Sequence, residues 1–259
     1  MNPNKIVLFG LLLYFNSLNA QFHESISPKQ LYVLATESNV YLHILVKDKL
    51  YQINHIKKEM AEKEMDYTIA LFYENLNAIE NELTDKDLLS QMKAIKEFWK
   101  KFEPYLTNDL TSNDFKKFHF EAYTFSKLLT NFSEKLFLKF NLNEKDWKNF
   151  NDIQSLKILV QKITFEYLAK TLQLNQSLTN QFIKDVNNFE SLIKNKSNKF
   201  LNDILIGNKF LAVINEWNFF QRNLVHPKMK NVKTIFSLSL TMQNNLNAIT
   251  SEYLKWDLL

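Results

Sequence analysis

Cysteine is absent from this 259-residue sequence, which also contains only two glycines and four prolines. Without cysteine the protein has no disulfide bonds and no thiolate metal site, and we expect no lipid anchor attached to an N-terminal cysteine. So few glycines exclude a glycine-rich phosphate-binding loop. An all-β protein needs many more glycines and prolines in its turns. The composition therefore predicts an all-α protein that is stabilised by its core.

The N-terminus has the pattern of an export signal. Lys5 supplies a positive charge, residues 6–15 form an apolar run, and Leu18-Asn19-Ala20 is a suitable cleavage site. We expect residues 1–20 to be a signal peptide and the mature protein to be periplasmic or secreted. The run is short for a spanning helix, although a single N-terminal anchor is the alternative. No later stretch has the roughly 18 to 20 apolar residues of a spanning helix, so we expect no transmembrane segment after signal removal.

One pattern of apolar residues occurs twice, 118 positions apart. Its first copy is Ala94, Trp99, Phe102 and Leu106, and its second copy is Ala212, Trp217, Phe220 and Leu224. Each copy is followed by an apolar stripe with steps of four and three residues, which is the spacing of one helix face. The stripes are Phe118, Ala122, Phe125, Leu129, Phe132 and Leu136, then Ile235, Ser239, Met242, Leu246, Ile249 and Tyr253. We interpret this as an internal duplication; the alternative is chance similarity between amphipathic helices.

The duplication predicts two tandem antiparallel four-helix bundles. We expect the first bundle in residues 26–140 and the second in residues 152–256. The expected helices are 28–52, 56–82, 85–105, 113–139, 150–174, 178–195, 199–223 and 227–256. The polar stretch 141–151 between the bundles is either a hinge or a continuation of the fourth helix into the fifth.

Helix ends are marked by capping residues and prolines. Ser27-Pro28 and His226-Pro227 are typical of helix starts, and so is the sequence from Thr84 to Asp87. Pro104 should bend or end its helix.

Two further matches between the copies bear on their lengths. The segment from Tyr73 to Leu76 resembles that from Phe189 to Leu192 at a shift of 116. If Tyr41 corresponds to Tyr167, the first copy carries about ten extra residues between positions 47 and 63, which is nearly three helical turns.

The two copies resemble the PilJ/NarX-type sensor domain of type IV pilus chemotaxis transducers and nitrate-responsive histidine kinases. The first helix of that family carries a run close to Asn-x-Ala-Gly-Arg-Gln-Arg-Met-Leu-Ser-Gln-Arg, which we compare with residues 27–36 and 154–163. A Phe-Glu segment at Phe189 and helices carrying Trp99 and Trp217 are similar to later features of the family. The resemblance implies periplasmic four-helix bundles that sense a small ligand.

The position of the arginine that reads the ligand in that family corresponds to Leu31 in one copy and Lys157 in the other. Leu31 cannot bind an anion, and lysine lacks the planar fork of arginine. Arg222 is the only arginine of the chain, whereas lysine is abundant, so the change follows a general replacement of arginine. A lysine beside a glutamine remains in both copies. The candidate ligand-binding residues are Lys29, Gln30, Lys157, Gln161 and Lys162.

No residue pattern indicates catalysis. The histidines are scattered and form no His-Glu-x-x-His pair, although His43 and Lys47 share a helix face. His119 is expected at the edge of an apolar helix. Glu74 and Glu190 occupy matching positions, but sequence alone does not give the distance needed for paired acid–base chemistry. We therefore expect no enzymatic activity, no metal and no cofactor.

The net charge of +4 is spread along the chain rather than gathered in a patch, which argues against nucleic-acid binding. Four aromatic residues are candidates for an exposed partner surface, although we expect Phe220 in the core. The four are Trp147, Phe219, Phe220 and Trp256.

We expect an exported helical-bundle protein that binds a small anion, another small ligand or a protein partner. Because no kinase or chemotaxis domain follows the bundles, a signal would pass through contact with an envelope protein. The alternative is a periplasmic structural or interaction scaffold with a decayed ligand site, which Leu31 favours. Convergence of Lys157, Gln161 and Lys162 on one pocket would favour binding.

Overall fold

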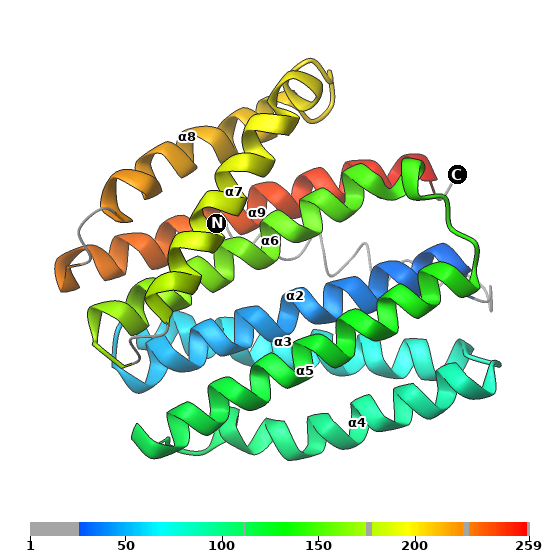
Figure 1. Cartoon of the computed structure of the whole chain (residues 1–259), viewed down its shortest axis with the longest axis horizontal. Coiled ribbons are helices and arrows are strands. Elements are labelled where there is room, and N and C mark those ends of the chain that lie inside the picture. Colours follow the sequence, from blue (N-terminus) through cyan, green and yellow to red (C-terminus); the bar gives the residue numbers. More distant parts are fainter. Residues whose placement is uncertain (1–25, 111, 175–177, 225–227, 258–259) are drawn as a thin grey trace, which may run out of the picture.

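The computed structural model describes residues 26–110, 112–174, 178–224 and 228–257. Within these ranges the chain forms eight helices and no strand, which confirms the predicted all-α fold (Figure 1). The helices are α2 (Pro28–Ile53), α3 (Lys58–Glu82), α4 (Lys86–Thr107), α5 (Ser112–Lys139), α6 (Glu144–Thr171), α7 (Leu178–Leu201), α8 (Gly207–Leu224) and α9 (Met229–Asp257). None of these helices is long and apolar enough to cross a membrane. The predicted signal peptide and Pro227 lie outside the described residues.

The helices pack as two groups of four. α2, α3, α4 and α5 contact one another, and α6, α7, α8 and α9 do the same. In each group the first helix contacts the second and the fourth, and the third contacts the fourth. Short connections make consecutive helices antiparallel, as Figure 1 shows. We call the groups bundle 1 and bundle 2.

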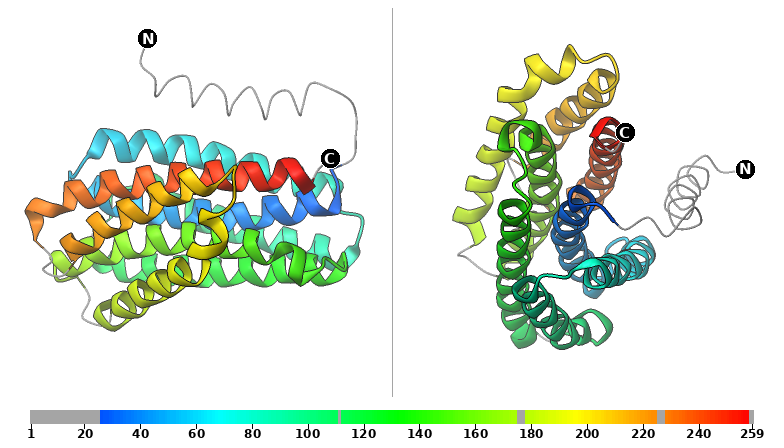
Figure 2. Two further views of the ribbon diagram at one scale, coloured as in Figure 1. Left: turned by 90° about the horizontal axis from the view of Figure 1, so that it is seen from above. Right: turned by 90° about the vertical axis from the view of Figure 1, so that its right-hand side faces the viewer.

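The bundles lie side by side because α2 packs against α6 (Figure 2). The two helices run in the same direction and occupy the middle of the molecule (Figure 1). Side chains on all faces of α2 are consequently buried, including the polar Lys47 and Asp48. A helix that is buried all round shows no strong amphipathic pattern, and this explains why neither α2 nor α6 has the clear stripe of the other helices.

The duplication is visible in the packing of aromatic rings. Trp99 packs on Phe72 with ring centroids 4.4 Å apart, and Trp217 packs on Phe189 at 4.1 Å. Both predicted apolar stripes are buried except for Tyr253, which is partly exposed. The equivalent of Phe189 is therefore Phe72, at a shift of 117, and its predicted match with Tyr73 is wrong by one residue.

An aspartate accepts hydrogen bonds from the second and third following backbone N–H groups near the start of the third helix in both bundles. Asp85 Oδ1 accepts hydrogen bonds from two backbone N–H groups at the start of α4, at 3.0 Å each. Asp203 Oδ1 accepts from the backbone of Leu205 and Ile206 at 2.9 and 3.2 Å. The two aspartates are 118 positions apart, so these bonds support the duplication.

The predicted ten-residue insertion in the first copy is wrong. α2 and α6 have 26 and 28 residues, and α3 and α7 have 25 and 24. Buried positions of α2 match those of α6 at a shift of 118, as in the pairs Ala35/Ile153 and Leu42/Val160. Tyr41 therefore corresponds to Leu159 rather than to Tyr167.

Three predicted joints and helix ends can be compared with the structure. The joint between the bundles is not a continuous helix, because α5 ends at Lys139 and α6 starts at Glu144, where the Asn143 side chain caps it. Pro104 was predicted to bend or end its helix, and it does not end α4, which continues to Thr107. α8 starts at Gly207 instead of position 199, because the chain turns closely there: a Cβ atom on Gly207 would lie 2.7 Å from the Leu201 carbonyl oxygen.

The aromatic residues considered for a partner surface have different environments. Trp147 is buried and its ring meets that of Tyr32 edge-on at 5.2 Å. Phe220 is buried as expected, whereas Phe219 is 51% exposed. The side chain of Trp256 lies outside the described residues.

Candidate functional site

The first two predicted ligand residues lie at the start of α2. The Gln30 side chain accepts a hydrogen bond from Ser27 N at 2.7 Å, and Ser27 Oγ accepts one from Gln30 N at 3.3 Å. These reciprocal bonds form a capping box, which satisfies backbone groups that the helix start leaves unpaired. Gln30 therefore has a structural role that explains its presence, and Lys29 lies half-buried in the same turn.

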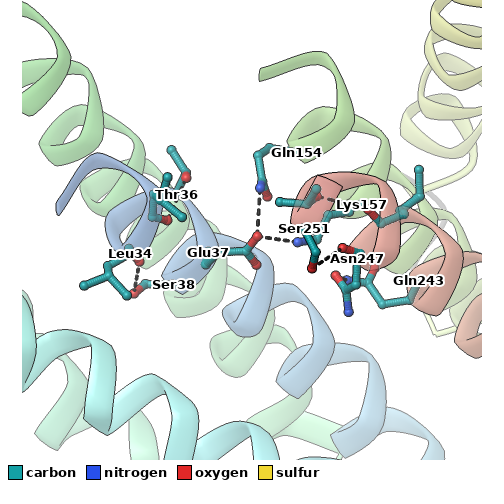
Figure 3. A network of polar contacts seen from close by, with 12 residues as sticks. Leu34, Thr36, Glu37, Ser38, Gln154, Lys157, Gln243, Asn247 and Ser251 are labelled. Carbon is teal, nitrogen blue, oxygen red and sulfur yellow. Dashed lines mark hydrogen bonds and ion pairs between the residues drawn. The ribbon is translucent and has the colours of Figure 1, made fainter. Parts of the chain in front are cut away.

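Lys157 lies in the seam between the bundles, where α6 faces α2 (Figure 3). Its side chain is 1% exposed and its ammonium group forms an ion pair with the Glu37 carboxylate of α2. Gln154 Nε2 donates a hydrogen bond to the same carboxylate oxygen, Glu37 Oε1, at 2.7 Å. A lysine and an amide from bundle 2 thus hold one carboxylate from bundle 1.

Burial controls the electrostatics of this pair. Loss of water around Lys157 lowers the pKa of its ammonium group, and the nearby Glu37 carboxylate acts in the opposite direction. A buried ammonium group without a partner is costly, so removal of Glu37 would leave an uncompensated charge. The pair therefore fixes how the two bundles meet.

Gln161 also lies inside the molecule, one helical turn from Lys157. It is fully buried, and its Nε2 donates to Gln243 Oε1 of α9 at 3.0 Å. Gln243 in turn donates to Asn247 Oδ1 at 3.1 Å, which continues the polar chain along α9 (Figure 3). These bonds tie α6 to α9 within bundle 2.

Lys162 points to another side of α6, towards α7. Its ammonium group pairs with Asp185 Oδ2 at 2.5 Å, and 29% of the lysine side chain is exposed. Lys157, Gln161 and Lys162 therefore face α2, α9 and α7 respectively. The five predicted residues therefore do not come together in one pocket. The prediction failed because the sequence did not show that α6 has neighbouring helices on several sides.

Lys162 and Asp185 line an open groove between α6 and α7, with a volume of about 580 Å³. The side chains around it are Ser155, Ile158, Leu159, Lys162, Gln181, Lys184, Asp185, Asn188, Ser191 and Leu192. Gln181 Nε2 donates to Asp185 Oδ1 at 2.8 Å. Buried close to Asp185 is Glu166, whose pKa is raised to about 9 by loss of water and by the charge of Asp185. Glu166 is consequently uncharged at neutral pH.

Bundle 1 contains a related cluster of charges at the corresponding place. Lys47 Nζ lies 2.9 Å from Glu64 Oε2 and 3.1 Å from Asp48 Oδ1, and Asp48 is fully buried. Burial, followed by the charge of Glu64, raises the pKa of Asp48 well above its usual range. Asp48 and Glu166 are 118 positions apart, so a buried acid recurs at equivalent positions. The repeat spacing would have identified this pair, which sequence analysis missed.

His43 and Ser126 come together between α2 and α5, with Nε2 and Oγ 3.1 Å apart. Ser126 Oγ donates its proton to Asn39 Oδ1 at 2.9 Å, so the histidine must donate to the serine rather than accept from it. This orientation is opposite to that of an activated serine nucleophile. Burial lowers the pKa of His43 to about 3, so it is neutral over the physiological range.

Among the described residues, no three histidine, aspartate or glutamate side chains form a group that could hold a metal ion. Comparisons of the chain with protein-family models, with curated proteins and with solved structures find no match.

Proposed function

We propose that this protein is a non-enzymatic, exported interaction scaffold, related to PilJ/NarX-type sensor domains, in which the protein's own Glu37 occupies the former ligand position. The observation that carries the proposal is the ion pair between Lys157 and Glu37 across the two bundles. In the comparison with the family, Lys157 stands at the position of the ligand-reading arginine, although the repeat shift of 118 pairs Lys157 with Asn39 and not with Leu31. The positive charge of Lys157 is already paired with the Glu37 carboxylate of the same chain.

A tethered carboxylate is a strong competitor for any free anion. Its effective concentration at the lysine is set by the fold, and short connections give effective concentrations in the millimolar range or above. Gln154 adds a hydrogen bond to the same oxygen of Glu37. A free anion would have to displace both interactions and enter a seam in which Lys157 is 1% exposed.

The proposal assigns the buried polar residues to assembly of the two bundles and leaves their outer surfaces for an envelope partner. Phe120 and Tyr123 are 66% and 64% exposed on α5, and Ile204 is 97% exposed before α8. Phe120 and Tyr123 are three residues apart on α5, which is the spacing of one helix face, so they are candidates for a partner surface. The scaffold interpretation is thus favoured over binding of an anion at Lys157.

The test is thermal unfolding of the chain from Gln21 to Leu259 with nitrate, nitrite, phosphate or acetate. We expect no anion-dependent shift for the wild type. Glu37→Ala vacates the carboxylate position, so acetate or nitrate should restore part of the stability that this variant loses. A ligand at 100 times its dissociation constant adds about 2.7 kcal/mol.

The matched control is the double variant Glu37→Ala/Lys157→Met, which removes the cation as well and should not respond to anions. A saturable anion-dependent shift of the wild type that disappears in Lys157→Ala would contradict the proposal. It would show that Lys157 still binds an external ligand.

A further inference from the structure

The first and second helices carry two tyrosines in bundle 1 at the positions where an open groove lies in bundle 2. At the shifts of 118 for the first helix and 117 for the second, Tyr41 corresponds to Leu159 and Tyr67 to Lys184. Tyr41 packs against the core near Tyr67, and burial raises its pKa well above the usual range. In bundle 2 these two rings are absent, and the groove of about 580 Å³ occupies the corresponding place.

The direction of the second helix also differs between the two bundles. In Figure 1, α7 is inclined across α6, whereas α3 runs alongside α2. The volume of the groove lies within the range of about 300 to 1,000 Å³ that is typical of small-ligand sites. Bundle 1 carries Tyr41 and Tyr67 at the positions equivalent to Leu159 and Lys184, so the residues of bundle 2 differ where the groove opens.

The groove offers an apolar surface beside polar groups. Ile158, Leu159 and Leu192 supply the apolar part. Ser155, Asn188 and Ser191 supply groups that donate and accept hydrogen bonds. Such a mixture suits a small organic molecule with an apolar body and a polar head.

The charged residues of the groove determine which charge on the polar group of a ligand is favoured. Lys162 and Lys184 carry positive charges, and Asp185 carries one negative charge that is paired with Lys162. Glu166, which lies behind Asp185, is uncharged at neutral pH because its pKa is raised to about 9. The local balance is therefore one positive charge, and the exposed Lys184 is placed to meet a ligand anion.

We propose that the groove between α6 and α7 binds a small organic anion, a carboxylate whose apolar body lies on Ile158, Leu159 and Leu192 and whose head meets Lys184. This site is distinct from the seam at Lys157, and the inference does not depend on the proposed scaffold function. It requires no movement of the bundles, since the groove is open to solvent.

Three probes of similar size test the sign of the charge: 3-phenylpropionate, 3-phenylpropanol and 2-phenylethylamine. Each is titrated into the uniformly ¹⁵N-labelled full chain, and backbone amide shifts are followed by NMR at pH 7. We expect 3-phenylpropionate to give saturable shifts in residues 155–162 and 181–192, with a dissociation constant on the order of a millimolar. The neutral alcohol should bind about tenfold more weakly, because it lacks the charge-assisted hydrogen bond.

The variant Lys184→Tyr copies the residue of bundle 1 and should weaken binding of 3-phenylpropionate at least tenfold. Its matched control is Lys194→Tyr, the same substitution at an exposed position of α7 that does not line the groove, and it should bind like the wild type. Both lysines are exposed, so neither variant should unfold the protein.

Several outcomes would overturn the proposal. They are the absence of saturable shifts for 3-phenylpropionate up to about 10 mM, equal binding by Lys184→Tyr, and shifts that map outside the groove. Stronger binding of 2-phenylethylamine would show that Asp185 selects a cation instead. Shifts centred on Glu37 and Lys157 would argue against the scaffold function and against this site together, whereas groove shifts alone would leave the scaffold function intact.

Discussion

The two bundles share a central contact between a tryptophan and a phenylalanine and differ in the residues between their first two helices. In each, a tryptophan packs on a phenylalanine, at 4.4 Å in bundle 1 and 4.1 Å in bundle 2. Bundle 1 adds further rings around Trp99, including Phe125 and Tyr73. Bundle 2 has fewer rings and an open groove. The central tryptophan contact is therefore present in both bundles although the rings around it differ.

The largest expected effect comes from removing the central tryptophans. Trp99 and Trp217 are 1% and 3% exposed, and replacing a buried aromatic residue by alanine costs about 3 to 5 kcal/mol. We expect Trp99→Ala to lose more stability than Trp217→Ala because Trp99 contacts more rings. Urea unfolding followed by circular dichroism measures both losses.

Phe219→Ala serves as the control, because Phe219 lies on α8 near Trp217 in sequence but is 51% exposed. Its effect should stay within about 0.5 kcal/mol. Equal losses for the two tryptophan variants would show that ring number does not distinguish the bundles.

An intermediate effect concerns the buried acids Glu166 and Asp48. The pKa of Glu166 is about 9 in the folded protein, against 4.5 as its ordinary value. The folded state therefore holds a proton that the unfolded state loses, so the contribution is fully present below pH 4.5 and disappears as the pH rises towards 9. Glu166→Gln removes this dependence and should be more stable than the wild type at pH 9, by about 1 to 3 kcal/mol.

Urea unfolding at pH 5 and pH 9 measures this difference. Asp48→Asn is the matched variant in bundle 1, where the direction of the pKa shift is the same. The pH effect should therefore have the same sign in both variants. A difference from the wild type that is identical at the two pH values would mean that Glu166 is ionised throughout.

The smallest expected effect concerns the caps of the central helices. Ser27 and Gln30 bond to each other's backbone at the start of α2, whereas Asn143 makes one bond, to Lys145 N, at the start of α6. Replacing such a cap by alanine costs about 1 kcal/mol. We expect Ser27→Ala to cost more than Asn143→Ala, as a shift of the urea midpoint without change in slope. The reverse order would show that the capping box adds nothing.

Much of the fold could be predicted from sequence because six helices have a regular apolar stripe. The Trp99 and Trp217 patterns gave the duplication and the shift of 118. The prediction of an insertion failed in α2 and α6, whose all-round burial removes the stripe that would align them. Tyr41 and Tyr167 were matched by residue type, although Tyr41 and Leu159 share the structural position.

The candidate site was harder to predict because it depends on contacts between helices far apart in sequence. Lys157 was expected to face a ligand, but its partner is Glu37, 120 positions away. Lys162 was predicted to bind a ligand, which stays a prediction, and in the structure it lines the groove between α6 and α7. No periodicity in the sequence encodes how α7 lies against α6.

The ion pair between Lys157 and Glu37 also has a consequence for symmetry. α2 and α6 are equivalent helices that run in parallel, as two identical subunits would place them across a twofold axis. Under that axis the position of Lys157 corresponds to Asn39, and that of Glu37 to Ser155. The two residues related to this pair by the axis, Asn39 and Ser155, are uncharged, so the charge pair has no counterpart at the equivalent positions. A symmetric dimer of identical chains would form every such contact twice. A single, asymmetric ion pair between the two bundles is possible because both bundles belong to one chain.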